Sequence, residues 1–231
     1  MKTHIGLIGG IGPAATISYY KRLVEQFTKS DLPLKLTIEH AEMSVLLKNA
    51  VHDRREAQAE VFAKHLDNLA AAGCDIGLIT ALTGHFCFEE TRKKSTIPLL
   101  DGTAVIDTYC QENGIKSVGL LGSPPVLKTK LFGLLNAVET IVPRNGIDDL
   151  GRTYMKLAQT GVCTTAQRSL LFEAGNSMVK DQHAEAVLLA GTDLGLAFDN
   201  QSPGFPVIDA LQLHVGEFVS RATRALPYDN F

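Results

Sequence analysis

The most informative part of the sequence is Ile76-Gly77-Leu78-Ile79-Thr80-Ala81-Leu82-Thr83-Gly84-His85. Its first four residues form an apolar run that is too short for a helix, which is typical of a parallel strand covered on both faces. The residues after Ile79 then stand at the carboxyl end of this strand. In open α/β sheets this end carries the ligand site, because side-chain hydroxyls and the free N–H groups of the next helix converge there. We therefore expect Thr83, Gly84 and His85 to face a ligand, the alternative being an ordinary turn in which Thr83 caps a helix.

A second stretch, from Ala186 to Gly195, has the same build. An apolar run comes first, then glycine and threonine, then an acid. Each of the two stretches follows an earlier glycine-ended strand at a similar distance, residues 5–10 in the first case and 118–123 in the second. This spacing indicates an internal duplication, in which two α/β units face each other across one cleft.

The length of 231 residues is enough for one or two small α/β domains with a sizeable core. We predict two Rossmann-like, flavodoxin-like three-layer domains related by a pseudo-twofold axis, with the ligand cleft between them. The first domain comprises residues 1–100 together with 207–231, and the second comprises residues 101–206.

Composition and charge argue against several classes of partner. A formal net charge of -3 gives no reason to expect binding to nucleic acid or to an acidic membrane surface. No apolar run approaches the length of a transmembrane helix, and the amino terminus has no signal-peptide pattern. We expect a cytoplasmic protein.

The four cysteines are Cys74, Cys87, Cys110 and Cys163. They show neither the pairing of a disulfide framework nor Cys-x-x-Cys spacing, so we expect reduced thiols and no metal site. Cys87 follows His85 by two residues and is the one thiol with an alternative role, since it could enter the cleft. Positions two apart on a helix face different ways, which argues against that role.

The glycine loop at residues 9–12 precedes Pro13, which is well suited to a helix start. Glycine permits a close approach of the backbone to a ligand. A nucleotide phosphate site is the alternative, but the spacing does not give G-x-G-x-x-G. The following helix, predicted over residues 14–27, places Ile17, Tyr20 and Val24 on one face, and residues 34–38 alternate as a strand does.

Four segments together resemble the aspartate/glutamate racemase family, of the cofactor-independent kind. They are residues 6–16, residues 80–85, residues 190–194, and residues 206–209 followed by His214. The resemblance covers essentially the whole chain. It implies an isomerase of amino acid metabolism that needs no cofactor, including no PLP, and that binds a small acidic amino acid or carboxylic acid. It also implies a homodimer.

The family's pattern is Cys-Asn-Thr-Ala-His at the first site and Gly-Cys-Thr-Glu at the second. By this resemblance Ala81 stands at the first catalytic cysteine and Gly191 at the second. Racemisation without a cofactor needs a base on one face of the α-carbon and an acid on the other, and a thiolate tuned in pKa suits both tasks. A methyl group and a hydrogen can do neither, so the two-thiol mechanism is expected to be lost.

The resemblance also implies a set of substrate-binding residues. The family's arginine has its nearest counterpart in Lys48, which offers a point charge without the bidentate fork. The other positions that the family motifs place against a substrate are Gly10, Thr16, Leu82, Thr83, Gly84, Gly191 and Thr192.

If catalysis persists, the candidate catalytic residues are Thr83, His85, Thr192 and Asp193. Asp193 could act as the base once a closed cleft raises its pKa, whereas threonine hydroxyls are more suited to anchoring a ligand. The alternative for His85 and His214 is a hydrogen bond to a backbone carbonyl that pins a loop. The leading hypothesis is therefore a racemase-family isomerase or its descendant. The competing hypotheses are a non-catalytic binding or regulatory protein, and a lyase or isomerase that uses Asp193 and His85 in place of thiols.

Overall fold

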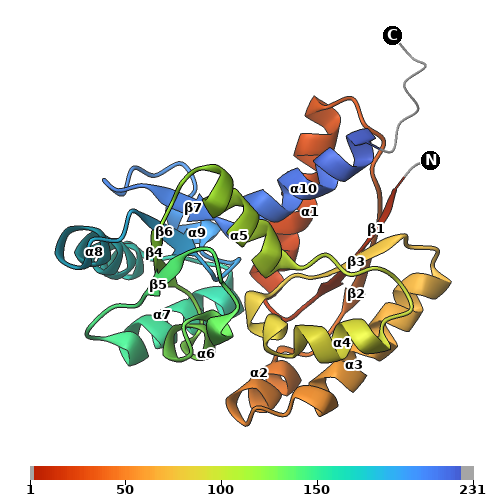
Figure 1. Ribbon diagram of the computed structural model, residues 1–231, viewed down its shortest axis with the longest axis horizontal. Coiled ribbons are helices and arrows are strands. Elements are labelled where there is room, and N and C mark those ends of the chain that lie inside the picture. The colour runs from red at the N-terminus through yellow and green to blue at the C-terminus, as the bar shows by residue number, and fades with distance from the viewer. Residues whose placement is uncertain (1–2, 225–231) are drawn as a thin grey trace.

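The chain forms two parallel β-sheets, each flanked by helices, in a computed structural model that describes residues 3–224 (Figure 1). The predicted α/β class with two layered units is confirmed. Within the described residues no helix has the length and apolar character needed to cross a lipid bilayer.

The first sheet has the strand order β2-β1-β3. Both pairings are parallel, with Ile5 opposite Leu36 on one side and Ile76 on the other. Every residue of β1 and of β3 is buried, whereas β2 is partly exposed. The bounds are β1 His4–Gly9, β2 Lys35–His40 and β3 Ile76–Ile79.

Helices cover both faces of the first sheet. Helix α1 starts at Pro13, as the sequence predicts, and buries Tyr19, Leu23 and Phe27 at a spacing of four residues. The last helix, α10, follows the second sheet in the chain and packs on α1 of the first unit. The bounds are α1 Pro13–Lys29, α2 Met43–Val51, α3 Arg55–Ala71, the 3-10 helix η1 Leu82–Cys87, α4 Phe88–Lys94 and α10 Ala210–Arg224.

The second sheet has the order β5-β4-β6-β7, again with parallel neighbours. Its longest helix, α8, begins with a capping box in which Thr164 and Gln167 bond reciprocally. The strands are β4 Ser117–Leu121, β5 Glu139–Ile141, β6 Ala186–Leu189 and β7 Val207–Asp209. The helices are α5 Gly102–Glu112, α6 Pro124–Lys128, η2 Leu131–Gly133, α7 Ile147–Thr160, α8 Thr165–Gln182 and α9 Gly195–Phe198.

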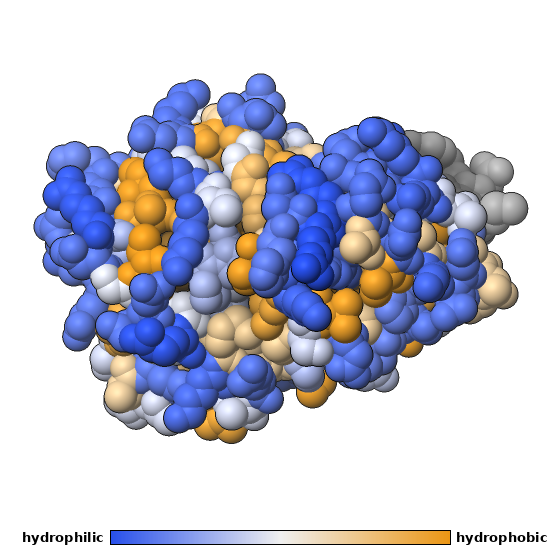
Figure 2. Space-filling model, turned by 90° about the horizontal axis from the view of Figure 1, so that it is seen from below, coloured by the Kyte–Doolittle hydropathy of each residue, from blue (hydrophilic) through white to orange (hydrophobic). Residues whose placement is uncertain are grey.

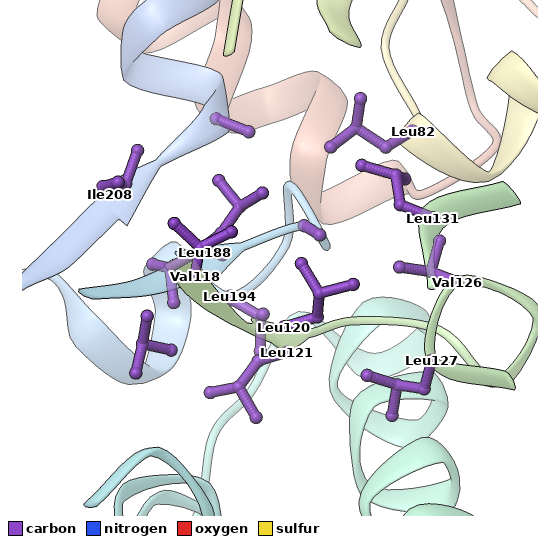
Figure 3. Close-up of a cluster of buried hydrophobic side chains, with 14 of the residues drawn as sticks. Leu82, Val118, Leu120, Leu121, Val126, Leu127, Leu131, Leu188, Leu194 and Ile208 are labelled. Carbon is purple, nitrogen blue, oxygen red and sulfur yellow. The ribbon is translucent and has the colours of Figure 1, made fainter. Parts of the chain in front are cut away.

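The hydrophobic core of the second unit includes one residue of the first. Figure 3 shows Leu82 of η1 beside Leu131 and Val126, in the same cluster as the strand residues Leu120 and Leu188. Leu82 is therefore part of the packing that joins the two units, rather than a residue open to a ligand.

The chain passes between the two units twice, before α5 and before α10. The second domain was predicted to begin at residue 101, and α5 begins at Gly102 with Asp101 as its cap. The return was predicted at residue 207, but β7 pairs with β6 of the second sheet. A boundary at Ala210, where α10 begins, therefore fits the sheets better than one at 207.

A cluster of charged side chains also ties the units together. Arg22 of α1 donates to Asp199 at 2.5 Å and to Asp209 at 2.9 Å. The guanidinium also donates to Gln212 at 2.9 Å. Asp199 follows α9 and Asp209 ends β7, so Arg22 joins α1 to two segments of the second unit, and Gln212 joins it to α10.

Candidate functional site

The two strand tips singled out by the sequence lie against each other. The hydroxyl of Thr192, just after β6, donates to the carbonyl oxygen of Thr80 at 2.8 Å. A second link joins the hydroxyls of Thr83 and Ser123, which are 2.7 Å apart. The carboxyl ends of β3, β4 and β6 thus converge at one place, as expected for facing α/β units.

The first tip is fixed by a chain of hydrogen bonds through two buried histidines. Tyr19 donates its hydroxyl to Nδ1 of His214 at 2.6 Å, and Nε2 of His214 donates to the carbonyl of Gly102 at 3.0 Å. The N–H of Gly102 donates to Nε2 of His85 at 3.1 Å. His85 then donates from Nδ1 to the carbonyl of Ala81 at 3.3 Å. Both ring nitrogens of each histidine are occupied, and each partner fixes one neutral tautomer.

Burial keeps these histidines uncharged. It lowers the pKa of His85, and it lowers the pKa of His214 to about 3 with a smaller contribution from the nearby His85. Neutral rings bonded to backbone groups fit the alternative in which both histidines pin loops. Because both ring nitrogens of His85 bond to the backbone, neither is free to contact a substrate in the catalytic role that was predicted for this residue.

The second tip carries an ionisable group, Asp193. Its carboxylate accepts from the N–H of Ala15 at 2.6 Å and from the hydroxyl of Tyr154 at 2.9 Å. Ala15 is in the first turn of α1, so the side chain occupies the helix amino terminus where an anion is favoured. Burial raises the pKa of Asp193 to about 6, against the opposing effect of these hydrogen bonds.

Tyr154 of α7 is a site residue that the sequence did not single out. Its ring packs directly on Gly191, where an added Cβ would lie only 2.2 Å from Cε2. The spacing of Leu150, Tyr154, Leu157 and Ala158 marks a buried helix face. That pattern predicts burial of Tyr154 but does not show that its ring contacts Gly191 at the second tip.

The cleft between the tips is nearly filled. A cavity of about 10 Å³ remains, which is enough for about one water molecule and too small for an amino acid. Thr83 and Ser123 supply hydroxyls to its wall, and the ten residues that line it include no charged side chain. The lining residues are Ile11, Met43, Leu46, Leu47, Ala81, Thr83, Ser123, Tyr154, Met155 and Ala158.

The mouth of this cavity lies between α2 and α7, one helix from each unit. Met43, Leu47 and Met155 are half-buried there. Figure 2 views the molecule from the side on which α2 and α7 lie, where weakly polar and apolar residues run between hydrophilic ridges. Methionine and leucine side chains are flexible, so this rim can adapt more easily than the strand tips behind it.

Several residues predicted to bind substrate lie elsewhere. Thr16 accepts from the N–H of Gly10 at 2.9 Å and donates to the carbonyl of Gly12 at 3.2 Å, so it stabilises the glycine loop. Gly84 packs tightly on Ile79 and Phe62. Lys48 is exposed on α2, a helix that was not predicted, and is not part of the cavity wall.

The alternative in which Cys87 enters the cleft is wrong. Its thiol is fully buried and contacts the carbonyl of Gly84 at 3.5 Å and the hydroxyl of Thr91 at 3.6 Å. Burial raises its pKa to about 12, so it is not a thiolate near neutral pH. Across residues 3–224, no three His, Cys, Asp or Glu side chains are grouped so as to hold a metal ion.

Comparison with known proteins identifies the family. The sequence profile described as Asp/Glu/Hydantoin racemase matches residues 8–218. The chain belongs to the Asp/Glu/hydantoin racemase family. This agrees with the family resemblance that the strand-tip motifs predict.

Solved racemase structures share the fold of this family member. An aspartate racemase homologue from Pyrococcus horikoshii OT3 has a TM-score of 0.78 and 21% sequence identity, over 96% of this chain and 100% of that one. The aspartate racemase of Picrophilus torridus has a TM-score of 0.78 and 19% identity, over 96% and 94% of the two chains. A glutamate racemase from Francisella tularensis subsp. tularensis, in complex with D-glutamate, has a TM-score of 0.67 and 13% identity, over 96% and 81%.

Proposed function

We propose that this racemase-family protein binds a small amino or carboxylic acid between its two strand tips without a cofactor, and that it has lost the two-thiol reaction. The observation that carries the second part is the contact of Gly191 with Tyr154. With a Cβ only 2.2 Å from the ring, the place expected for the second cysteine has no room for any side chain. Ala81, at the place expected for the first cysteine, lines the small cavity that Tyr154 also lines.

The cavity wall argues for the chemistry of the ligand. The hydroxyls of Thr83 and Ser123 bond to each other, so one proton of the pair is free to donate to a carboxylate, and apart from Tyr154 the rest of the wall is apolar. A second carboxylate, as in an acidic amino acid, would meet no cationic side chain among the residues of this wall and would be costly to bury. The geometry therefore favours a monocarboxylate with an apolar substituent over an acidic amino acid.

Binding requires the cleft to widen, because its present volume holds no more than a water molecule. The side chains that must move are Met43, Leu47 and Met155 at the mouth and Tyr154 behind them. The energy needed for this change lowers the apparent affinity, since only the open fraction of molecules can take up the ligand.

A second candidate function is an isomerase or lyase that uses Asp193 as its base. The pKa of about 6 is suited to proton transfer near neutral pH, and Tyr154 donates to the carboxylate at 2.9 Å. His85, which was expected to assist, is engaged with the backbone through both ring nitrogens. A catalytic Asp193 would therefore act with Tyr154.

One experiment separates the two functions. Proton NMR in D₂O follows exchange at the α-carbon for a panel of amino and hydroxy acids, while calorimetry measures their binding. We expect binding of apolar monocarboxylates without exchange. Thr83→Ala should weaken that binding, whereas Ser44→Ala, on an exposed position of α2, should leave it unchanged. Exchange that is lost in Asp193→Asn would instead establish the second function, and absence of binding across the panel would refute the proposal.

Restoring the thiols tests the assignment of Ala81 and Gly191. Because Tyr154 blocks the second position, the variant must combine Ala81→Cys and Gly191→Cys with Tyr154→Ala. We expect this triple variant to exchange α-protons that the wild type does not. The matched control is Tyr154→Ala alone. A folded triple variant that binds ligand and exchanges no proton would show that these two positions are wrongly assigned.

A further inference from the structure

Residues 130–133, which include η2, form a turn of left-handed backbone. The φ angles are 52° at Lys130, 56° at Leu131, 57° at Phe132 and 64° at Gly133. A left-handed conformation brings Cβ too close to the following carbonyl oxygen, so residues that have a side chain normally adopt it singly. Only Gly133 adopts it without this steric cost. The three residues before Gly133 therefore hold strain, which the surrounding structure must support.

Two apolar side chains of this left-handed turn pack against the first unit. Leu131 is fully buried beside Leu82 of η1, as Figure 3 shows. The ring of Phe132 lies against that of Phe86, also in η1, with 5.9 Å between the ring centroids. Phe132 is partly buried and packs on the apolar clusters of both units. The turn thus belongs to the second unit but has its apolar side chains against η1 of the first.

The hydrogen bonds within the turn do not explain its hand. The N–H of Gly133 donates to the carbonyl oxygen of Lys130 at 3.3 Å, which is a bond between residues three apart. A right-handed 3-10 turn makes bonds of the same kind. The N–H of Phe132 donates to the hydroxyl of Thr129 at 2.9 Å, and a rotatable hydroxyl accepts in many geometries. The contacts with η1 do depend on the hand, because a change of φ at three residues re-aims their side chains.

The same parts of the two units meet at the strand tips. Thr83 of η1 bonds to Ser123 at 2.7 Å, and Ser123 is the residue that precedes α6. Helix α6 in turn ends at Lys128, two residues before the left-handed turn. A motion that parts η1 from α6 therefore breaks the Thr83–Ser123 bond and also withdraws Leu82 and Phe86 from the turn. The contacts that support the strained backbone are lost in the same motion that opens the cleft.

We propose that the left-handed turn is a two-state element that sets how readily the cleft opens. While the tips are together, contacts with Leu82 and Phe86 hold residues 130–132 at positive φ. When the tips part, the turn relaxes to negative φ, and release of the strain offsets part of the contact energy that is lost. The strain therefore favours opening. The proposed ligand needs this motion, but the inference concerns the protein without ligand and does not depend on what binds.

The backbone amide of Ala15 reports on this opening. Its N–H, in the first unit, donates to the carboxylate of Asp193, in the second unit, at 2.6 Å. In the first turn of α1 it has no carbonyl partner within the helix, so it is exposed to exchange once the tips part. Leu7 and Leu120 lie in the inner strands β1 and β4 of the two sheets, and their amides exchange on global unfolding. Hydrogen exchange of these three amides, followed by NMR, therefore measures opening and unfolding separately.

The test is glycine in place of Lys130, whose side chain is exposed. The reference variant is Lys130→Ala, which loses the long side chain but keeps the Cβ that causes the strain. In both variants the Ala15 amide should exchange faster than those of Leu7 and Leu120. Its exchange should be about threefold or more slower in Lys130→Gly than in Lys130→Ala, because glycine relieves strain that is present only in the closed state. Exchange of Leu7 and Leu120 should be slowed by a similar factor.

The matched control is the pair Lys64→Gly and Lys64→Ala, at an exposed position inside the right-handed helix α3. There glycine should speed exchange of Leu7 and leave that of Ala15 unchanged, since it destabilises the helix whether the cleft is open or closed. Equal exchange of Ala15 in the two Lys130 variants would show that the turn keeps its hand when the tips part, and would overturn the proposal. So would an Ala15 amide that exchanges no faster than Leu7 and Leu120, because the units would then not open short of global unfolding.

Discussion

The two strand tips that meet in this molecule differ in the way they are held. The tip after β3 is bound by neutral groups, through a chain from Tyr19 and His214 to His85 and the carbonyl of Ala81. The tip after β6 is bound through an acid, Asp193, which reaches the amino terminus of α1. A duplicated pattern in the sequence has thus given one tip at which burial lowers the pKa of two histidines and one tip at which burial raises the pKa of a carboxyl group.

This difference places any remaining proton chemistry at the second tip. A histidine with a pKa of about 3 cannot serve as an acid near pH 7, whereas a carboxyl with a pKa of about 6 changes charge close to that pH. The same difference predicts opposite effects of the two tips on stability in mild acid. Variants that remove one effect at a time can separate them.

The largest change in the free energy of unfolding is expected from His214 at the first tip, on acidification. Because the pKa of His214 is lowered in the folded state, its contribution to stability is full above about pH 6.5 and is lost as the pH falls towards 3. From His214 alone the loss by pH 4 should be on the order of 3 kcal/mol. His214→Gln should be less stable at pH 7 but lose less on acidification. Urea unfolding as a function of pH measures this, with the exposed His52→Gln as control.

An acid-dependent loss of stability that is the same in wild type and His214→Gln would contradict this account. The groups responsible would then lie elsewhere, and the first tip would no longer differ from the second in the way described. His85 has a lowered pKa for the same reason, so His85→Gln should change the acid dependence in the same direction.

A smaller effect is expected from crowding at the second tip. Gly191→Ala places a methyl group against the ring of Tyr154, which should destabilise the protein by about 2 kcal/mol. Ala81→Cys, at the first tip, extends into the residual cavity and should cost less. Thermal and urea unfolding of both variants provide the comparison. In the double variant Gly191→Ala/Tyr154→Ala the two losses should not add, and simple additivity would show that the ring is not what excludes a side chain there.

The smallest effect at pH 7 is expected from Asp193→Asn. The amide can still accept from Ala15, so the change in unfolding free energy should be within about 1 kcal/mol. Since the folded-state pKa of Asp193 is raised, the wild type gains stability from this group as the pH falls from about 6 to 3.8. Asp193→Asn lacks that gain and should lose stability more steeply over this range. A shallower loss than in the wild type would reverse the assigned sign.

Much of the fold could be predicted because its elements carry strong local signals. Pro13 begins α1 and short apolar runs form β1, β3, β4 and β6, each with parallel neighbours. Helix α2 was not predicted; it is short, and no side chain caps its amino terminus. The outward face of α1 could not be foreseen, since Ile17, Tyr20 and Val24 have the spacing of a core face, and spacing alone does not show which face meets the sheet.

The site was less predictable, because it depends on contacts between residues distant in the chain. The motifs identified Thr80, Thr83 and Thr192, and these do lie together. No motif pointed to Tyr154, whose ring crosses from α7 to Gly191, or to the small volume left between the tips. Lys48, the nearest counterpart of the family's arginine, lies on an exposed face of α2 and is not among the residues that line the cavity.

The backbone passes between the two units at two places, before α5 and before α10, and Gly102 and His214 lie just beyond those passages. Their hydrogen bond therefore joins both covalent connections, while residues of α2 and α7 line the cavity between the two units. A motion that widens the cavity and keeps this bond would turn the two units about these connections. The Thr192–Thr80 and Thr83–Ser123 hydrogen bonds join the two units at the strand tips, so they must break before the tips can separate.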